Sequence, residues 1–596
     1  MKKYSLPVYN KENIDQIEEN QLQFTISDKL FLEMILLRIR GETIKFSTIK
    51  KQQEQEREKN LIKDISTLEQ NQDLSQITDL LENKKDELQN IRNVRLKGQM
   101  VRSRVQWLDE GEKPTIFFCA LENSNYINKT IKKINLGNQN LVTDQNGILT
   151  AVRNFYKDLF KSRDDTLHDI NLTDLFKNTH VEKLNQIETD SLECPLTITE
   201  LSNTLSNMKN NKTPGIDGFP ADFYKFFWSK LKFFVLRSIN QCYETGELST
   251  TMKQAIISCL PKGDKPREFL KNWRPISLLN VTYKLASGSI AARLKNILGK
   301  IISNTQTGFI SNRFIGESTR LIYDIMNFCE NDNKTGLLML IDFEKAFDSV
   351  SWKFIESTLR FLNFGNSFRS WINLLNNNIS ASVTQCGHLS DFFTIERGCR
   401  QGDPIAPYLF IICGQILYMM IDSNSDIKGI EIDDIEYKLT QFADDTTLLL
   451  DGTEGSLQSA LNTLEIFGSY SGLRMNRDKT RVIWIGRKKI SRDKLNTVPQ
   501  LQWGHSTFDL LGIKFSVNLK EMTELNYNKY IQQSIEIANH WSKRYLTPLG
   551  KITVIKTFIL SKFIHLFSAL PNPPVNIVNK INNVMFKFLW NINRTS

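Results

Sequence analysis

Two short stretches decide the fold of this chain: Leu337–Asp348, with the sequence LLMLIDFEKAFD, and Gln441–Leu450, with the sequence QFADDTTLLL. The first is a continuous apolar run that ends at Asp342, which is typical of a strand buried on both faces. The second places Asp444 and Asp445 between two apolar arms, which predicts a β-hairpin with the carboxylates at its tip. A carboxylate at the edge of a buried strand is costly unless its charge is compensated.

The three carboxylates together predict a two-metal site. Asp342, Asp444 and Asp445 would repel one another if they met without divalent cations among them. Oxygen ligands around two Mg²⁺ ions, about 3.5–4 Å apart and with Mn²⁺ as a substitute, serve in-line displacement at phosphorus. The pair of stretches therefore predicts the palm of a nucleic-acid polymerase. An isolated Asp-Asp pair is more often a solvated turn, but the apolar flanks and the presence of Asp342 weaken that alternative.

Asp348 is a fourth carboxylate in the first stretch, and we interpret it differently. The spacing of Trp352, Ile355 and Leu359 predicts a helix that begins near Ser349. A carboxylate just before a helix stabilises the helix start. We therefore expect Asp348 to support this helix rather than to bind metal.

Two basic residues that precede Asp342 in the chain suit the binding of a triphosphate. Lys262 lies in a Gly/Pro turn after an apolar segment, and Arg274 lies in the next apolar segment, Asn272–Asn280. On facing strands, a lysine and an arginine can neutralise a triphosphate, the arginine by bidentate contact.

Two later turns complete the series of motifs that a polymerase site is expected to contain, in this order along the chain. Arg397–Pro404 is glycine-rich and leads into the apolar segment Pro407–Met420; its Gln401 carries both donors and acceptors for a sugar or a base. Ser471–Thr480 contains Lys479, which could neutralise or protonate a leaving pyrophosphate. Each turn alone is a modest signal, and the order of the whole set is the strong one.

The composition is that of a globular protein with several substructures. The chain has 596 residues, 40% hydrophobic and 24% charged, and a formal net charge of +10. From Ile537 to Ser596 it contains no Asp or Glu, which predicts a phosphate-facing surface. The basic residues of this stretch are Lys543, Arg544, Lys551, Lys556, Lys562, Lys580, Lys587 and Arg594.

The sequence gives no sign of secretion or of a membrane span. The eight cysteines are scattered without a C-x-x-C pair, which favours a reducing compartment. The apolar stretch Ile552–Leu570 is interrupted by Lys556 and Lys562, so we expect a helix packed on a core. The expected location is intracellular, as a cytoplasmic or nuclear ribonucleoprotein.

The pattern along the chain predicts an α+β protein in four parts. Residues 1–110 form an N-terminal helical extension, with one or two long helices over about 50–104, and residues 111–194 adjoin the next part. Residues 195–516 alternate strands with helices in a mixed pattern. Residues 517–596 are helical, with helices expected over Glu524–Tyr545, Lys551–Leu570 and Asn576–Trp590.

The ordered motifs resemble the reverse transcriptase of LINE-type non-LTR retrotransposons, the core of their second open-reading-frame protein. Besides the segments already described, the resemblance rests on Asn211–Phe219 (NKTPGIDGF), Gln306–Ile310 (QTGFI), Phe442–Asp445 (FADD) and Leu511–Ile513 (LGI). It implies a right-hand polymerase with fingers, palm and thumb. The implied partners are an RNA template, a DNA primer or RNA–DNA hybrid, and dNTPs.

The resemblance also assigns roles by position. It implies that Asp342, Asp444 and Asp445 hold the two Mg²⁺ ions, and that Lys262 and Arg274 contact the incoming dNTP. It makes Phe347 a steric gate under the sugar, Gln401 a residue of the nucleotide pocket, and Lys479 the lysine of the later palm motif. Leu511–Ile513 would lie near the primer grip, and the helices after Glu524 would form the thumb.

Some features depart from the family, and alternatives stay open. Asn312 stands before Arg313 where the family usually has glycine. No stretch resembles the endonuclease or the zinc knuckle of the family, so we expect a truncated element. The alternatives are a group II intron-type reverse transcriptase and a catalytically inactive nucleic-acid-binding remnant. An RNA-dependent RNA polymerase is disfavoured because Phe347 leaves little room for a 2′-hydroxyl.

Overall fold

The computed structural model describes residues 26–70, 78–103, 130–137, 141–163, 171–263, 265–491, 495, 501–504 and 506–590, without the side chains of 78 and 95–103. The chain divides into two compact units. Unit 1 comprises residues 1–158, 195–289 and 370–395, and unit 2 comprises residues 159–194, 290–369 and 396–596. The predicted boundary at 110/111 and the basic Arg594 lie outside the described residues.

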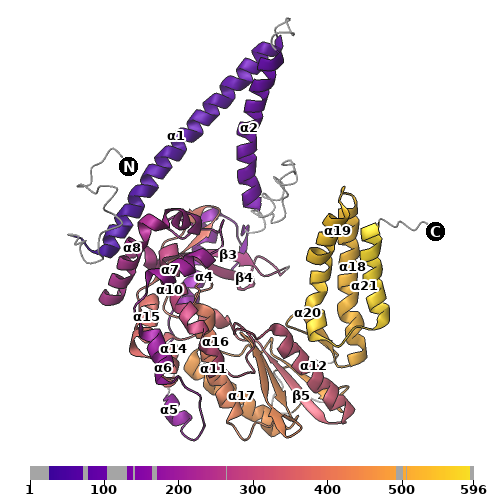
Figure 1. Cartoon of the computed structure of the whole chain (residues 1–596). Coiled ribbons are helices and arrows are strands. Elements are labelled where there is room, and N and C mark those ends of the chain that lie inside the picture. Colours follow the sequence, from indigo (N-terminus) through magenta and orange to yellow (C-terminus); the bar gives the residue numbers. More distant parts are fainter. Residues whose placement is uncertain are drawn as a thin grey trace. The chain divides into compact units, whose positions relative to one another are not determined.

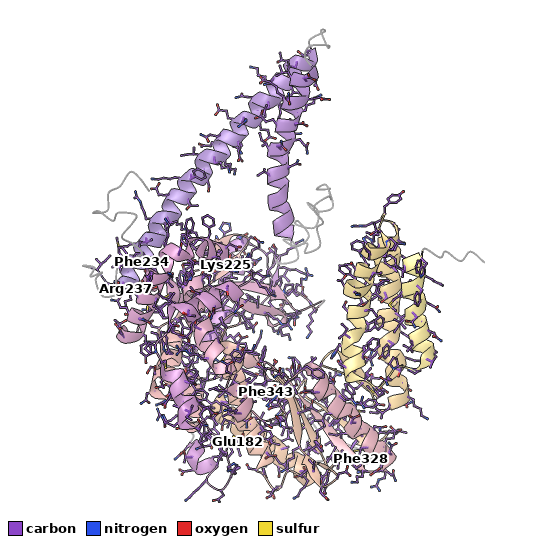
Figure 2. The ribbon with its side chains drawn as sticks, viewed as in Figure 1. Glu182, Lys225, Phe234, Arg237, Phe328 and Phe343 are labelled. Atoms are coloured by element: carbon purple, nitrogen blue, oxygen red, sulfur yellow. The ribbon has the colours of Figure 1, made fainter. Side chains whose placement is uncertain are left out.

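Two long helices open unit 1 and confirm the helical prediction for this region. They are α1 (Asp28–Gln70) and α2 (Thr78–Ser103) (Figure 1). The first turns of α1 pack on α8 (Ala221–Thr245). Leu32 and Leu36 are buried there, and the Asp28 carboxylate pairs with Arg237 at 3.2 Å. Arg237 and its neighbour Phe234 are labelled in Figure 2.

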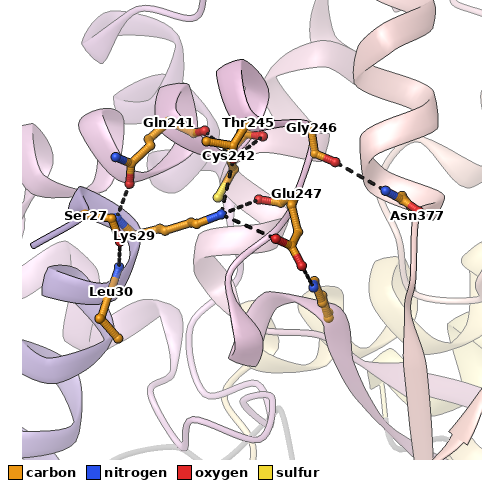
Figure 3. Close-up of polar contacts among 10 residues, drawn as sticks. Ser27, Lys29, Leu30, Gln241, Cys242, Thr245, Gly246, Glu247 and Asn377 are labelled. Atoms are coloured by element: carbon orange, nitrogen blue, oxygen red, sulfur yellow. Dashed lines mark hydrogen bonds and ion pairs between the residues drawn. The ribbon is translucent and has the colours of Figure 1, made fainter.

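Polar contacts fix the start of α1 in the same place (Figure 3). The Lys29 amide donates to Gln241 Oε1 at 2.9 Å, and Lys29 Nζ donates to Thr245 Oγ1 at 3.2 Å. Lys29 Nζ also pairs with Glu247 at 3.8 Å. The start of α1 is thus attached to the rest of unit 1 by both apolar and polar contacts.

A mixed five-stranded sheet forms the centre of unit 1. Its order is β4-β3-β6-β7, with β8 also paired to β6; β3 and β6 are parallel and the other pairs are antiparallel. These strands are β3 (Gln254–Pro261), β4 (Trp273–Leu278), β6 (Ser380–Gln385), β7 (His388–Leu389) and β8 (Phe393–Thr394). The other elements are β1 (Ile134–Asn135), β2 (Leu141–Val142), α4 (Gln145–Phe160), α7 (Ile198–Asn207) and α9 (Thr250–Lys253). The division between the units falls inside α10 (Val281–Lys295) and α15 (Asn366–Asn376) and near the end of α4.

A second five-stranded sheet, in unit 2, has the order β11-β12-β5-β13-β14. Its strands are β5 (Thr335–Ile341), β11 (Leu439–Phe442), β12 (Asp445–Leu450), β13 (Arg481–Gly486) and β14 (Gln502–Gly504). β5 is the middle strand, and Leu337, Leu338 and Met339 are fully buried. The predicted buried strand before Asp342 is confirmed, as is the hairpin β11–β12.

Helices and two small hairpins complete unit 2. They are α5 (Leu172–Leu175), α6 (Gln186–Glu193), α11 (Leu298–Ile301), α12 (Ile315–Asn331), α16 (Ala406–Asp422), α17 (Glu454–Ser471), β9 (Ile430–Ile432), β10 (Ile435–Tyr437), β15 (Thr507–Leu510) and β16 (Ile513–Ser516). A hydrophobic core joins β5, β12 and β13 to α12, to the β15–β16 hairpin and to the C-terminal helices.

The C-terminal helices agree with the sequence prediction. They are α18 (Met522–Ser542), α19 (Pro548–Val554), a π-helical segment (Ile555–Leu560), α20 (Ser561–Ala569) and α21 (Val575–Trp590). Within the described chain, Pro548–Ala569 is the one stretch long and apolar enough to cross a membrane, by length and composition alone. Ile559, Phe563 and Leu566 of this stretch lie in the hydrophobic core, which supports the interpretation of a packed helix.

The region after β5 corrects one prediction. A short helix, α13 (Ala346–Ser349), ends at Val350 in extended conformation, and α14 (Trp352–Phe361) begins afresh. The helix expected to begin near Ser349 is therefore present, but it begins slightly later, at Trp352. Ser351 is the N-cap, and its hydroxyl accepts the Phe354 amide at 3.4 Å, because the break leaves the first amides of α14 unpaired.

Candidate active site

Strand pairing brings the two aspartate-bearing stretches together. The last residue of β5, Ile341, pairs with Thr446 of β12. Because the strands are antiparallel, Asp342 and Asp445 stand at neighbouring positions one step beyond this pair. Asp444 lies in the two-residue turn before Asp445, where Ala443 adopts a left-handed conformation with φ of 56°.

The charges of the three carboxylates act on one another. The pKa of Asp445 is raised from 3.8 to about 6, first by desolvation and then by the negative charges of Asp444 and Asp342. Asp444 and Asp445 are nevertheless exposed residues, so the desolvation comes from crowded surroundings rather than from complete burial. A bound cation would relieve this repulsion among the carboxylates.

Lys479 supplies one compensating charge. Its Nζ donates to Asp342 Oδ2 at 2.8 Å, with both side chains partly exposed. The loop that carries it runs beside the end of β5. The Asn476 amide donates to the Asp342 carbonyl at 2.7 Å, and the Glu344 amide donates to the Arg474 carbonyl at 2.9 Å. Phe343, the residue after Asp342, is labelled in Figure 2.

The carboxylate oxygens of the three aspartates are the type of ligand that a hard divalent cation binds. Carboxylate oxygens are the ligands that Mg²⁺ prefers, and the pKa of Asp445 is raised by desolvation and by the negative charges of Asp444 and Asp342. As the side chains stand, no three Asp, Glu, His or Cys groups among the described residues form a ready metal site. Asp342 is turned to Lys479, so it would have to exchange that partner in order to bind a metal ion.

Phe347 and Gln401 lie on two segments that are bonded to each other. The Phe347 ring stacks on Phe410 of α16, with ring centroids 4.4 Å apart, and the Phe347 carbonyl accepts the Cys399 amide at 2.6 Å. Gln401 Nε2 donates to Asp348 Oδ1 at 3.4 Å. The structure therefore brings the two predicted pocket residues into one neighbourhood.

Asp348 does not have the predicted role at the start of α14. It lies inside α13, is 2% exposed, and accepts the hydrogen bond from Gln401. The fit around it is tight at Gly398, where φ is 89° and an added Cβ would come within 2.7 Å of the Asp348 carbonyl oxygen. Only glycine combines this conformation with this close approach.

Lys262 and Arg274 lie together in unit 1. Arg274 of β4 pairs with Leu260 of β3, so the prediction of facing strands is confirmed. The Lys262 amide donates to the Asn272 carbonyl at 2.9 Å, and Lys262 Nζ donates to the Lys271 carbonyl at 3.2 Å. Arg274 is exposed. Their role toward a nucleotide stays a prediction.

Asn312 accounts for the departure from the family at that position. Its φ is 65°, a left-handed conformation that asparagine tolerates better than most residues. Arg313 can then donate to the carbonyls of Ile302 at 3.0 Å and Gln306 at 2.9 Å. The backbone thus reaches the conformation that a glycine would favour.

Sequence reasoning missed Gln306, which touches the turn that carries Asp444. The residue is 1% exposed, and its Oε1 accepts the Ala443 amide at 2.9 Å. Its only sequence signal is its place in the QTGFI segment, whose residues carry no predicted role.

The chain is similar in sequence to known proteins. Residues 260–515 match the sequence profile of the family described as reverse transcriptase (RNA-dependent DNA polymerase). The chain is 27% identical over 510 residues to the transposon TX1 uncharacterized 149 kDa protein of Xenopus laevis, a match that covers 85% of the chain and 38% of that protein. It is 26% identical over 291 residues to the Pol polyprotein of the type-2 retrotransposable element R2DM of Drosophila melanogaster, covering 48% of the chain and 26% of that protein. The chain thus spans less than half the length of these relatives.

Fold, site and similarity together define the class: the chain carries a reverse transcriptase domain, of the class of RNA-directed DNA polymerases. More particularly, the relatives that the chain resembles are proteins of the transposon TX1 and of the retrotransposable element R2DM, which is in keeping with the resemblance to LINE-type reverse transcriptases. Domains of this family generally use divalent metal ions and act on nucleic-acid templates, primers and nucleotides.

Proposed function

We propose that the chain catalyses template-directed DNA synthesis on RNA, by nucleotidyl transfer from a dNTP to a primer 3′-hydroxyl. The meeting of Asp342 with the Asp444–Asp445 turn, at the ends of paired central strands, is the observation that carries this proposal. A carboxylate cluster with a lysine bonded to one member supplies the groups that phosphoryl transfer needs.

In the proposed reaction, the primer 3′-oxygen attacks the α-phosphorus and the bond to pyrophosphate breaks. Asp342, Asp444 and Asp445 would hold two Mg²⁺ ions, which when bound would acidify the primer hydroxyl and neutralise the leaving group. Lys479 would pass from Asp342 to the pyrophosphate and protonate or neutralise it there. Phe347 would lie under the sugar, and Gln401 would bind the sugar or base.

We further propose that the sheet of β5, β11, β12 and β13 is a polymerase palm, that the β3–β4 region belongs to the fingers, and that α18–α21 form the thumb. Lys262 and Arg274 would contact the triphosphate. In the acid-free C-terminal stretch, Lys543, Lys556, Lys580 and Lys587 are exposed and suit a phosphate backbone. Lys551 suits it less, because it is buried and donates to the Leu589 carbonyl at 3.2 Å.

The expected partners are an RNA template, a DNA primer and dNTPs. The four-part layout at residues 110, 194 and 516 and the intracellular ribonucleoprotein location belong to the same proposal. The acid-free stretch and the net charge of +10 support a polyanionic partner.

Primer extension tests the proposed activity. Oligo(dT) annealed to poly(rA) is incubated with the chain, dTTP and Mg²⁺, beside reactions with EDTA and with unannealed primer. Extension that requires both template and Mg²⁺ is the expected result. Binding of the hybrid without extension would favour the catalytically inactive remnant instead.

A further inference from the structure

A buried glutamine, Gln306, contacts the backbone of the turn that presents Asp444. Its Oε1 accepts the amides of Ala443 at 2.9 Å and of Gly308 at 2.8 Å, and its Nε2 donates to the Ala443 carbonyl at 3.4 Å. One amide side chain thus binds both the N–H and the C=O of Ala443. The two positions lie 137 residues apart in the chain.

Ala443 needs such support. A two-residue hairpin turn with positive φ at its first position is usually built with glycine, asparagine or aspartate. Alanine in the left-handed region is strained by roughly 1–2 kcal/mol. Nevertheless Ala443 holds a φ of 56°, and it is 8% exposed. The two hydrogen bonds between Gln306 and Ala443 are made in this conformation and therefore oppose its relaxation.

Backbone contacts on either side of Gln306 also hold this segment against the strand that leads into the turn. The Thr307 amide donates to the Gln441 carbonyl at 2.9 Å, and the Gln441 amide donates to the Thr305 carbonyl at 2.8 Å. A Cβ at Gly308 would lie 2.6 Å from the Ala443 nitrogen, so glycine lets the two backbones approach. The segment Thr305–Gly308 is thus laid along β11 up to the turn.

We propose that Gln306 is a positioning residue for the metal-binding carboxylates: it fixes the Ala443 backbone and thereby sets where Asp444 and Asp445 point. This inference rests on the proposed function, because the placement of the carboxylates matters only if they bind the ions of the reaction. Gln306 would act through the Ala443 backbone, to which its side chain is hydrogen-bonded.

The test compares Gln306→Met with a matched variant, Gln415→Met. Methionine keeps the length of glutamine and removes its polar atoms. Gln415 is also buried, at 8% exposed, and its Oε1 accepts the Ser303 amide at 2.9 Å, yet it does not bond to the turn. Both variants therefore lose a buried side-chain amide, and only Gln306→Met releases Ala443. Gln306→Asn, which is one methylene shorter, is the second variant if Gln306→Met folds poorly.

Two measurements need no turnover. Hydrogen exchange followed by mass spectrometry on the peptide 439–448 should show faster exchange in Gln306→Met, by about tenfold at the Ala443 amide, and no change in Gln415→Met. Titration with Mn²⁺, followed by electron paramagnetic resonance, should show about tenfold weaker binding in Gln306→Met alone.

The third measurement is single-nucleotide incorporation. A displacement of catalytic groups by about 1 Å costs on the order of 10²-fold in rate, so Gln306→Met should lose maximal rate on that scale, with the KM for dTTP changed less than about threefold. Equal effects of the two variants on exchange, Mn²⁺ binding and rate would overturn the inference and make Gln306 merely structural. A wild type that binds the hybrid but never extends it would overturn the proposed function, whereas the exchange and Mn²⁺ comparisons report on Gln306 alone.

Discussion

Lys479 Nζ lies 2.8 Å from Asp342 Oδ2, so a lysine occupies the carboxylate that the proposed metal site needs. The side chains are 57% and 42% exposed, respectively, and water and salt therefore screen the pair. The contact can open at little cost. Asp342 can thus exchange Lys479 for a metal ion, and Lys479 can then bind a triphosphate.

Lys479→Met should separate stability from chemistry. A partly exposed ion pair contributes at most about 1 kcal/mol, so the free energy of unfolding in urea should change by no more than that. Mn²⁺ binding without nucleotide should become tighter, because the lysine no longer competes for Asp342, while the rate of incorporation falls. Lys353→Met, an exposed lysine of α14, is the control. Weaker Mn²⁺ binding in Lys479→Met would contradict this account.

The raised pKa of Asp445 predicts two pH dependences. The pKa of Asp445 is about 6 in the folded chain, whereas an ordinary aspartate, as in the unfolded chain, has a pKa of 3.8. The folded chain therefore binds this proton more tightly than the unfolded chain does. The contribution of Asp445 to stability is therefore present below about pH 4 and is lost as the pH rises through about 6. The difference in unfolding free energy between Asp445→Asn and the wild type should therefore favour the variant more at pH 7.5 than at pH 4. Urea unfolding of both proteins at the two pH values measures this difference. An equal difference at the two pH values would show that the shift is absent.

Incorporation should respond to pH in the opposite sense. Metal binding requires the deprotonated carboxylate, so at low Mg²⁺ the rate should fall as the pH drops below about 6. Raising the Mg²⁺ concentration should move this fall to lower pH, since the ion competes with the proton. A fall that stays at the same pH over a hundredfold range of Mg²⁺ would place the titrating group elsewhere.

Phe347→Ala should relax sugar discrimination. The ring is held by stacking on Phe410 at 4.4 Å, and because one added small group in a pocket changes discrimination by about 10–200-fold, we expect a change on that scale. The ratio of the efficiencies for dCTP and rCTP on an oligo(rG) template measures it. Phe410→Leu, which removes only the support, should give a smaller change in the same direction. An unchanged ratio in Phe347→Ala would remove the gate assignment.

Asp348→Ala should weaken nucleotide binding through Gln401. The substitution leaves the Gln401 amide without the acceptor it has at 3.4 Å and opens a buried site, with a cost of about 1–3 kcal/mol in unfolding free energy. If Asp348 acts by orienting Gln401, the KM for dTTP should rise equally in Asp348→Ala, Gln401→Ala and the double variant. Additive losses in the double variant would show that the two residues act separately.

Local patterns predicted the strand and the hairpin that carry the three aspartates, whereas distant contacts escaped prediction. The apolar run before Asp342 and the apolar arms around Asp444 and Asp445 each carry their own signal, so the buried strand and the hairpin could be read from the sequence. Asp348 could not be placed, because its burial depends on the Gly398–Gln401 segment some 50 residues away. Gln306 escaped for the same reason, since glutamine has no strong local preference and its partner is Ala443. The break between α13 and α14 depends on the extended conformation of Val350, which no periodicity marks.

The chain contains its own control for the central claim. Asp433 and Asp434 form a second Asp-Asp pair in a two-residue hairpin turn, between β9 and β10, and both are exposed. This pair is the solvated turn that Asp444 and Asp445 would be if they had no role in metal binding. The measurement is Mg²⁺-dependent extension of oligo(dT) on poly(rA) by Asp444→Asn/Asp445→Asn and by Asp433→Asn/Asp434→Asn. The account predicts that the first variant loses extension and that the second keeps the rate of the wild type. Extension retained by the Asp444→Asn/Asp445→Asn variant would contradict it.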